Sequence, residues 1–339
     1  MQAINEVTIQ TYLSAIDDEL QEALAQAKDV QSTRLYDMLA YHMGWKDDLL
    51  KSEARGKRLR PLMLLLTCSA AGGEWKDALP VAAAVEMVHN FSLIHDDIED
   101  HSALRRGRLT VWKKWGIPQA INAGDAMFTL AHLQAIKLRD KVSQSAALKA
   151  AEILQQACLH LTQGQYLDLA FEKRQEVTVE EYWSMVEGKT AALLSASTDI
   201  GAISAQSNEV ICNLYRQFGR LFGLAFQAQD DLLGIWGDSA LTGKSNQSDL
   251  ITRKKTLPIL HGLSMGGKFA ERWNCGPITP SETQEISSLL EDEGSKNYTS
   301  KIVTDLVQEA LQKLNDAKPV NESGLMLKEL TMNLVHRIS

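Results

Sequence analysis

Residues 88–100 read VHNFSLIHDDIED, an apolar segment that continues directly into an acidic one. In an α-helix, Asp96 and Asp100 lie four residues apart and share a face, about 6 Å from each other along the axis. Two carboxylates on one face repel each other unless a cation lies between them, and their hard oxygen atoms suit Mg²⁺. The segment therefore predicts a helix that leaves a hydrophobic core and presents its acids at one end. An exposed acidic helix face is the alternative.

A second acidic pair follows another apolar helical pattern. Residues 226–234 read FQAQDDLLG, with Asp230 and Asp231 adjacent. Buried acids are costly unless a partner neutralises them. A cation site shared by the two clusters across a helical cavity explains both, whereas a helix end that emerges into solvent explains only one. Asp238 lies eight residues after Asp230 and is a candidate outer ligand.

The fold predicted around these clusters is all-α. No proline lies between Pro118 and Pro258, so helix breakers are absent from that long stretch. Apolar residues recur there three and four positions apart, as in Ala147, Ala151, Leu154, Cys158 and Leu161. Alternation of β-branched residues is scarce, and no Asn-Gly or Asp-Gly hairpin signal is present. We expect one domain over residues 1–339, a bundle of long, mostly antiparallel helices around a central cavity.

Turn-forming residues divide the predicted helices. The expected connections are Lys51–Lys57, Gly72–Lys76, Ser102–Arg108, Glu172–Thr178, Gly237–Ser248 and Gly262–Pro280. Thr279–Glu282 reads as a helix start with Pro280 at an early helical position. Two further breaks, at residues 294–297 and 318–321, separate the final helices.

Composition excludes several classes of protein. The chain has 35 Lys and Arg against 43 Asp and Glu, a net charge of −8, which disfavours nucleic acid as a partner. The four cysteines are far apart, which argues against a zinc ribbon or a disulfide framework and indicates a reducing compartment. The longest apolar run, Pro61–Ala71, is too short for a membrane span, and the N-terminus has no secretory pattern. We expect a soluble, cytoplasmic protein.

Basic residues cluster beside glycines and predicted loops. They occur in the segments GKRLRP (56–61), RRG (105–107), GKT (188–190), GK (243–244) and RKK (253–255). Arg forks and Lys point charges bind phosphate, so these groups suggest anion sites, although ordinary surface solvation explains any single lysine.

The chain closely resembles the trans-isoprenyl diphosphate synthase family. Eight motifs occur in the family's order between Gly56 and Lys255: GKRLRP, VHNFSLIHDDIED, LRRG, NAGDAMF, GQYLDL, GKTAAL, FQAQDDLLGIWGD and TGK…DL…KKTLP. Each is weak by itself, but eight in order are specific. The resemblance implies condensation of isopentenyl diphosphate (IPP) with an allylic diphosphate in a homodimer with separate active sites.

The resemblance also implies residue roles. The acids of two aspartate-rich motifs would be catalytic and would bind three Mg²⁺ ions: Asp96, Asp97, Asp100, Asp230 and Asp231. Six residues match those that hold and ionise the allylic diphosphate: Arg105, Lys189, Thr190, Gln227, Lys244 and Lys254. Lys189 would also be catalytic. The IPP pocket would comprise Lys57, Arg60, His89 and Arg106. Mg²⁺ and the basic groups neutralise the departing diphosphate, an apolar cavity shields the allylic cation, and no nucleophilic side chain is required.

Three departures from the family pattern bear on function. Gly234 replaces a third aspartate of the second motif, which puts the outer metal position in doubt. Ser102 stands where an acid is frequent, and residues 108–112 read RLTVW instead of Pro-Thr followed by His. These changes suggest a bacterial subgroup.

Product length depends on Phe91, five residues and roughly 7.5 Å before Asp96 along the helix axis. Its ring would form the floor of the product cavity, and the small Ser92 would leave room beside it. In the family that this chain resembles, an aromatic residue at this position, without an insertion in the first motif or a second aromatic, is typical of a C20 product. Geranylgeranyl diphosphate (C20) is therefore the first expectation and farnesyl diphosphate (C15) the second. The alternative is that Phe91 only packs between helices.

Three other functions fit the sequence less well. A class I terpene cyclase shares the fold and the first motif but lacks an IPP pocket. A regulatory subunit tends to lose one aspartate motif, and both are present here. An enzyme that joins two allylic diphosphates would not need the IPP-type basic set.

Overall fold

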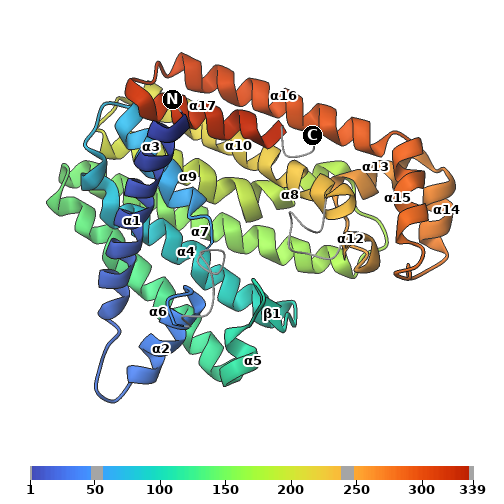
Figure 1. The fold of residues 1–339 in the computed structure, drawn as a ribbon, viewed down its shortest axis with the longest axis horizontal. Coiled ribbons are helices and arrows are strands. Elements are labelled where there is room, and N and C mark those ends of the chain that lie inside the picture. Colours follow the sequence, from blue (N-terminus) through green and yellow to red (C-terminus); the bar gives the residue numbers. More distant parts are fainter. Residues whose placement is uncertain (1, 47–55, 238–247, 336–339) are drawn as a thin grey trace. The chain divides into compact units, whose positions relative to one another are not determined.

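The computed structural model describes residues 2–46, 56–237 and 248–335, and these are almost entirely helical (Figure 1). The prediction of an all-α fold is confirmed. Contacts divide the chain into two compact units: residues 1–155, 196–213 and 319–326 form unit 1, and residues 156–195, 214–318 and 327–339 form unit 2.

Unit 1 consists mainly of the N-terminal elements. They are α1 (Gln2–Ala25), α2 (Thr33–His42), α3 (Leu59–Ala70), the 3₁₀ turn η2 (Trp75–Ala78), α4 (Leu79–Glu99), β1 (Leu104–Arg105), β2 (Arg108–Leu109), α5 (Val111–Trp115), α6 (Ile117–Ile136) and the 3₁₀ turn η3 (Lys137–Asp140). Helices α7 (Gln144–Glu172), α9 (Ala192–Ser204), α10 (Glu209–Trp236) and α17 (Asn321–Val335) contribute residues to both units.

Unit 2 contains the remaining elements. They are α8 (Val179–Val186), the π-helical turn η4 (Glu187–Ala191), α12 (Ser248–Ile251), α13 (Leu257–Met265), α14 (Lys268–Asn274), α15 (Thr283–Asp292) and α16 (Ser295–Asp316).

The core of unit 1 is built around α4. Every residue from Val81 to Val88 is buried, and α4 packs against α1, α3 and α6. A helix buried on all sides belongs at the centre of a bundle. Glu86 is buried with them because Arg58, at the start of α3, donates from Nη1 to its Oε1 at 2.9 Å. One of the three basic residues of GKRLRP therefore neutralises a core acid.

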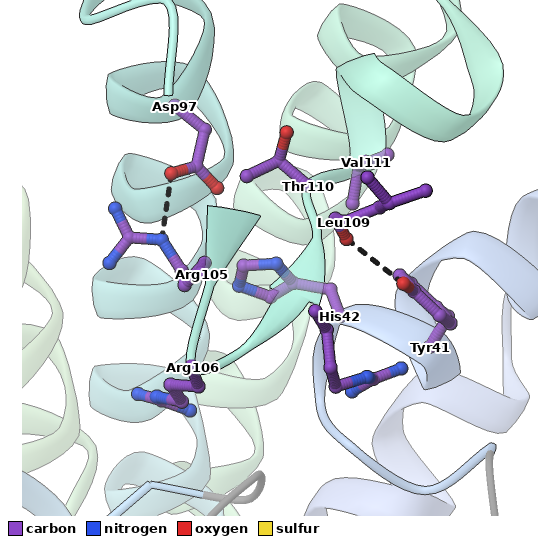
Figure 2. A pocket seen from close by; sticks show the side chains of 9 residues that line it. Tyr41, His42, Asp97, Arg105, Arg106, Leu109, Thr110 and Val111 are labelled. Atoms are coloured by element: carbon purple, nitrogen blue, oxygen red, sulfur yellow. Dashed lines mark hydrogen bonds and ion pairs between the residues drawn. The ribbon is translucent and has the colours of Figure 1, made fainter. Parts of the chain in front are cut away.

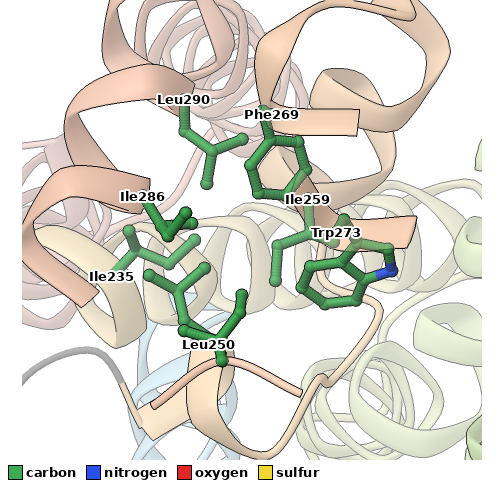
Figure 3. Packing of buried hydrophobic residues seen from close by; sticks show 8 residues of the cluster. Ile235, Leu250, Ile259, Phe269, Trp273, Ile286 and Leu290 are labelled. Atoms are coloured by element: carbon green, nitrogen blue, oxygen red, sulfur yellow. The ribbon is translucent and has the colours of Figure 1, made fainter. Parts of the chain in front are cut away.

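The core of unit 2 includes an apolar cluster from five helices (Figure 3). Its members come from α10, α12, α13, α14, α15 and the segment before α15: Ile235, Leu250, Ile259, Phe269, Trp273, Ile278, Ile286 and Leu290. Since Ile235 and Leu250 both pack in it, the cluster holds α12 beside the C-terminal end of α10.

Several predicted boundaries are confirmed and others are wrong. The connection Glu172–Thr178 lies between α7 and α8, and the break at 318–321 separates α16 from α17 as expected. The break expected at 294–297 lies earlier, between α15 and α16 at residues 293–294, because α16 already begins at Ser295. Gly262–Pro280 is not a single connection, because it includes the end of α13 and all of α14. Pro280 precedes the helix: α15 begins at Thr283 with Glu282 as its N-cap residue, and Glu282 accepts hydrogen bonds from the backbone and hydroxyl of Thr279.

Candidate active site

The first acidic motif ends α4. Asp97 is 1% exposed, and its Oδ1 accepts a hydrogen bond from Arg105 Nε at 2.8 Å. Within the described part of the chain, its buried Oδ2 has no hydrogen-bond partner. Burial raises the pKa of Asp97 to about 6, although Arg105 opposes the shift. Asp96 is half-buried and Asp100 exposed, so the three acids of the motif occupy different environments.

A short hairpin holds Arg105 in place. β1 and β2 pair antiparallel, with Arg105 opposite Arg108, around a turn in which Arg106 has φ 51° and Gly107 φ 74°. Two positive φ angles are typical of the type I′ hairpin turn. Thr110 Oγ1 and Trp112 Nε1 close the loop by donating to the carbonyl of Ser102 at 2.8 and 2.9 Å. The segment Ser102–Arg108 lies in the connection between α4 and α5, as expected, but it contains a hairpin that the sequence did not predict, because Arg-Gly supplies this turn instead of Asn-Gly.

Two residues predicted for the IPP pocket are in contact. Arg60 Nη1 lies 3.3 Å from His89 Nε2. Burial, then Arg60, Arg106 and Arg105, lower the pKa of His89 well below its ordinary value. A guanidinium can only donate, so Nε2 of the neutral imidazole accepts and Nδ1 carries the proton. The other two predicted members of the IPP pocket, Lys57 and Arg106, are exposed.

Unit 1 also contains a basic pocket (Figure 2), and two of its arginines, Arg105 and Arg106, are among the charges that act on His89. It is lined by Tyr41, His42, Asp97, Arg105, Arg106, Arg108, Leu109, Thr110 and Val111. Tyr41 donates its hydroxyl to the carbonyl of Leu109 at 2.9 Å, and the guanidinium carbon of Arg108 lies 3.9 Å from the centre of its ring. Burial, followed by Arg105 and Arg106, lowers the pKa of His42 to about 3. Sequence reasoning missed Tyr41 and His42, which belong to no recognisable motif.

In unit 2, one carboxylate forms ion pairs with two of the predicted diphosphate-binding lysines. Asp168 Oδ2 lies 2.5 Å from Lys189 Nζ and 3.7 Å from Lys254 Nζ. Burial would raise the pKa of Asp168, but Lys254 and Lys189 outweigh it and lower the pKa. Asp168 lies within the GQYLDL motif, yet no role was predicted for it.

Close backbone contact between α7 and η4 brings Lys189 to Asp168. A Cβ at Gly164 would lie 2.2 Å from the backbone nitrogen of Lys189, and a Cβ at Gly188 would lie 2.5 Å from the carbonyl oxygen of His160. Only glycine permits this approach. Residues 187–191 form a π-helical turn at the crossing, a distortion frequent at functional sites. The glycines of GQYLDL and GKTAAL are therefore explained by packing.

The second acidic motif divides into an exposed and a buried acid. Asp230 is exposed, whereas Asp231 is 3% exposed and accepts three hydrogen bonds. Its Oδ1 accepts from Gln227 Nε2 at 2.9 Å, and its Oδ2 from Tyr182 Oη at 2.7 Å and Leu257 N at 2.9 Å. Burial raises the pKa of Asp231 to about 6 despite these bonds.

The donors around Asp231 continue into a chain of predicted site residues. Thr190 Oγ1 donates to Gln227 Oε1 at 2.8 Å, and Gln227 then donates to Asp231. Since protein donors occupy both of its oxygens, Asp231 in this structure joins α8, α10 and the start of α13.

Two predicted residues, Lys244 and Asp238, lie outside the described residues. The RKK segment is described, and its three side chains separate. Arg253 Nη1 donates to the carbonyl of Gly276 at 2.5 Å, Lys255 Nζ donates to the carbonyl of Phe171 at 2.7 Å, and Lys254 reaches Asp168. Only Lys254 of the three belongs to the candidate site.

The donor chemistry fits magnesium. Among the described residues, no group of three His, Cys, Asp or Glu side chains is arranged to hold a metal alone. Mg²⁺ is usually bound by one or two carboxylates together with substrate phosphates and waters, so a complete protein cage is not expected. The half-buried Asp96 and the unpartnered Oδ2 of Asp97 provide hard oxygen donors in unit 1.

The two residues predicted to set product length face different neighbours. The Phe91 ring packs edge-on against Phe128 of α6, with centroids 4.9 Å apart, and against His95 at 5.9 Å. Ser92 is buried, and its hydroxyl donates to the carbonyl of His89 at 2.8 Å. Phe91 therefore has a packing role between α4 and α6, whatever its role toward a product.

Comparison with known proteins identifies the family. Residues 48–290 match the family described as polyprenyl synthetase. The chain is 40% identical over 287 residues to a (2E,6E)-farnesyl diphosphate synthase of Mycobacterium tuberculosis, covering 82% of this chain and 79% of that protein. It is 38% identical over 288 residues to a geranylgeranyl diphosphate synthase of the same organism, covering 83% and 81%. The chain belongs to the polyprenyl synthetase family.

Solved structures agree. A polyprenyl synthetase from Streptomyces coelicolor A3(2) superimposes with a TM-score of 0.88 at 33% identity, over 96% of this chain and 98% of that one. A geranylgeranyl pyrophosphate synthetase from Pyrococcus horikoshii gives a TM-score of 0.88 at 32% identity, with 98% of each chain covered. The resemblance drawn from the eight motifs is confirmed.

Proposed function

We propose that this chain is a trans-prenyl diphosphate synthase, a prenyltransferase that joins IPP head-to-tail to an allylic diphosphate. The carrying observation is that each unit holds its own set of cationic side chains beside an aspartate-rich motif. Arg60, Arg105 and Arg106 lie near His89 in unit 1, and Lys189 and Lys254 share Asp168 in unit 2. Two diphosphate substrates need two anion sites, whereas a terpene cyclase needs one.

The residues suggest a division of labour in the reaction. Asp168 holds the Nζ atoms of Lys189 and Lys254 near one carboxylate oxygen, so that both can bind the diphosphate that leaves the allylic substrate. As the allylic C–O bond breaks, the double bond of IPP forms the new C–C bond, and a proton is lost to the released diphosphate. Neutral His89 and Arg60 supply hydrogen-bond donors to the diphosphate of IPP, which is retained in the product.

We propose Mg²⁺ as the cofactor, with three ions as the family resemblance implies. Asp96 and Asp100 are the proposed ligands in unit 1, and Asp230 is the proposed ligand in unit 2. When bound, Mg²⁺ neutralises the charge that develops on the leaving diphosphate. Asp231 has a different proposed role, because it is buried and orients Gln227 and Tyr182. Asp97 orients Arg105 through its Oδ1 and offers its Oδ2 as a further donor for the metal.

We propose a C20 product, with C15 as the alternative. Relatives named for both products match this chain at nearly equal identity, 38% and 40%. The Phe91–Phe128 contact supports a rigid aromatic wall, since two packed rings resist displacement by a growing chain.

A cytoplasmic homodimer is also proposed. Helix α6 exposes four large aliphatic side chains, Ile117, Ile121, Leu133 and Ile136, each at least 44% exposed. A second copy of the chain is the occupant that the family resemblance implies for such a face. All four cysteines are free, which agrees with a reducing compartment. No helix in the described ranges is long and apolar enough to cross a bilayer.

A product assay tests the proposal. The purified protein is incubated with Mg²⁺, labelled IPP and, in turn, dimethylallyl, geranyl, farnesyl or geranylgeranyl diphosphate, and products are identified by mass before and after dephosphorylation. An elongated prenyl diphosphate that forms only with IPP supports the synthase and gives the chain length. A hydrocarbon or alcohol formed without IPP would indicate a cyclase and contradict the proposal.

A further inference from the structure

The second aspartate-rich motif lacks its third acid, and the space of that acid is filled from another segment. Gly234 lies four residues after Asp230 on α10, so the two positions share a helix face. A Cβ built at Gly234 would lie 2.2 Å from Asp249 Oδ2 and 2.9 Å from Asp249 Cγ. A side chain at position 234 would therefore require the Asp249 carboxylate to move.

The distance from the Cβ position of residue 234 to Asp249 Oδ2 matches the distance at which an aspartate at position 234 would carry its own carboxylate oxygen. In an aspartate, standard bond lengths put each carboxylate oxygen roughly 2.4 Å from its own Cβ. Asp249 Oδ2 lies at nearly this distance from the Cβ position of residue 234. The absence of an aspartate on α10 is thus matched by the presence of a carboxylate oxygen on the same face.

Packing fixes this arrangement. Ile235, next to Gly234, and Leu250, next to Asp249, are 2% and 0% exposed and belong to the same apolar cluster (Figure 3). The backbone also turns back toward Asp249, because its carbonyl accepts a hydrogen bond from Lys254 N at 3.0 Å. The segment that positions Lys254 beside Asp168 therefore also positions Asp249 beside α10.

We propose that Asp249 supplies the third carboxylate of the second metal-binding motif, in place of the residue that Gly234 does not provide. The inference rests on the proposed function and resolves the doubt that Gly234 raises. Asp249 and Asp230 would act together as hard oxygen donors toward Mg²⁺, directly or through a metal-bound water.

The test measures binding of inorganic pyrophosphate by calorimetry over a series of Mg²⁺ concentrations, with no turnover involved. Asp249→Asn keeps the shape of the side chain and removes its charge. We expect the half-saturating Mg²⁺ concentration to rise roughly 10- to 100-fold, with little change in melting temperature. Asp292→Asn, an exposed acid at the end of α15, is the matched control and should bind as the wild type does.

A reciprocal exchange separates a metal-directed role from a structural one. Asp249→Ala vacates the space, and Gly234→Asp alone crowds two carboxylates into it and should weaken binding. The double variant Gly234→Asp/Asp249→Ala returns one carboxylate to the same place, so its Mg²⁺ dependence should recover to within a few-fold of the wild type.

Three results would overturn the inference in distinguishable ways. Unchanged Mg²⁺ dependence in Asp249→Asn removes Asp249 from the metal site and leaves the proposed function intact. A folded double variant no better than Asp249→Ala shows that position 234 and Asp249 are not interchangeable. A wild type that binds pyrophosphate with no Mg²⁺ dependence contradicts the proposed function itself, and Asp230→Asn, which should lose binding, checks this reading.

Discussion

The buried aspartates of the two acidic motifs, Asp97 and Asp231, both have a raised pKa, but they have different hydrogen-bond partners. Burial raises the pKa of each to about 6. Asp97 is held by a single charged donor, Arg105, and one of its oxygens has no hydrogen-bond partner within the described residues. Asp231 is held by three neutral donors from three elements, which occupy both of its oxygens.

The difference shows how an adjacent pair of acids can be divided between two tasks. Consecutive residues of a helix point about 100° apart, so when Asp230 faces outward, Asp231 turns toward the packed interior. The interior acid stabilises neighbouring elements, and the outer acid is available to a cation. In unit 1 the interior acid, Asp97, can still offer one oxygen to a cation, because its salt bridge to Arg105 uses Oδ1 and leaves Oδ2 without a hydrogen-bond partner among the described residues.

The largest expected effect comes from the outer acids. Asp96→Ala or Asp230→Ala should lower turnover by at least about a thousandfold, since each removes several kcal/mol of metal-dependent charge stabilisation and about 1.4 kcal/mol corresponds to tenfold in rate. The measurement is incorporation of labelled IPP, with a melting curve to confirm folding. Asp140→Asn and Asp292→Asn, both exposed acids, serve as controls. Normal turnover in either alanine variant would remove that residue from the metal site.

The comparison between the interior acids predicts unequal stability losses. Asp231→Ala leaves the Tyr182 hydroxyl, the Gln227 amide and the Leu257 N–H without their acceptor, and should lower the free energy of unfolding by roughly 2–4 kcal/mol. Asp97→Ala leaves only Arg105, whose side chain is 31% exposed and can reach water, so about 1 kcal/mol is expected. Urea unfolding of both variants gives the two values. Equal losses would contradict the proposed difference between the pairs.

Acid sensitivity should come from unit 1. His42 has a pKa of about 3 in the folded protein against 6.5 ordinarily, and the pKa of His89 is lowered as well. Below pH 6.5 the unfolded chain binds protons at these histidines that the folded chain excludes, so each histidine lowers the stability as the pH falls, by up to about 1.4 kcal/mol per pH unit. Asp97 and Asp231, whose pKa values are raised in the folded chain, oppose this trend, because there the folded chain takes up protons before the unfolded chain does.

Melting curves between pH 7.5 and pH 5 check this sign. The slope of melting temperature against pH should become shallower in His42→Asn. Replacing His261 of unit 2 should change this slope less, because His261 is half-buried and only burial lowers its pKa. A slope unaffected by His42→Asn would mean that His42 charges freely in the folded protein.

The smallest effect on rate is expected at Phe91. Phe91→Ala removes the ring that packs on Phe128 and should lengthen the product by one or more isoprene units with little change in turnover. Phe128→Ala is the informative companion variant, because it loosens the same contact from the α6 side. An unchanged product in Phe91→Ala, combined with a lower melting temperature, would make Phe91 a packing residue only.

Much of the site was predictable because its signals are local. The acids of VHNFSLIHDDIED lie close to one another in the sequence, and each glycine-flanked lysine lies directly beside its glycine. Helical periodicity alone places Asp96 and Asp100 on one face. The hairpin at Arg106-Gly107 was missed because arginine rarely adopts a positive φ angle. Asp168 was overlooked because nothing within GQYLDL reveals that Lys189 and Lys254, 21 and 86 residues later, converge on it.

The sequence by itself determined the helical class, the family and the residues that carry charge, since these depend on composition, periodicity and short motifs. Only the tertiary structure decided which acid of each pair is buried, which lysines share Asp168 and what fills the space beside Gly234. Those features depend on contacts between segments far apart in the chain. Burial and pairing, which set the availability of each carboxylate, arise only when those segments pack together.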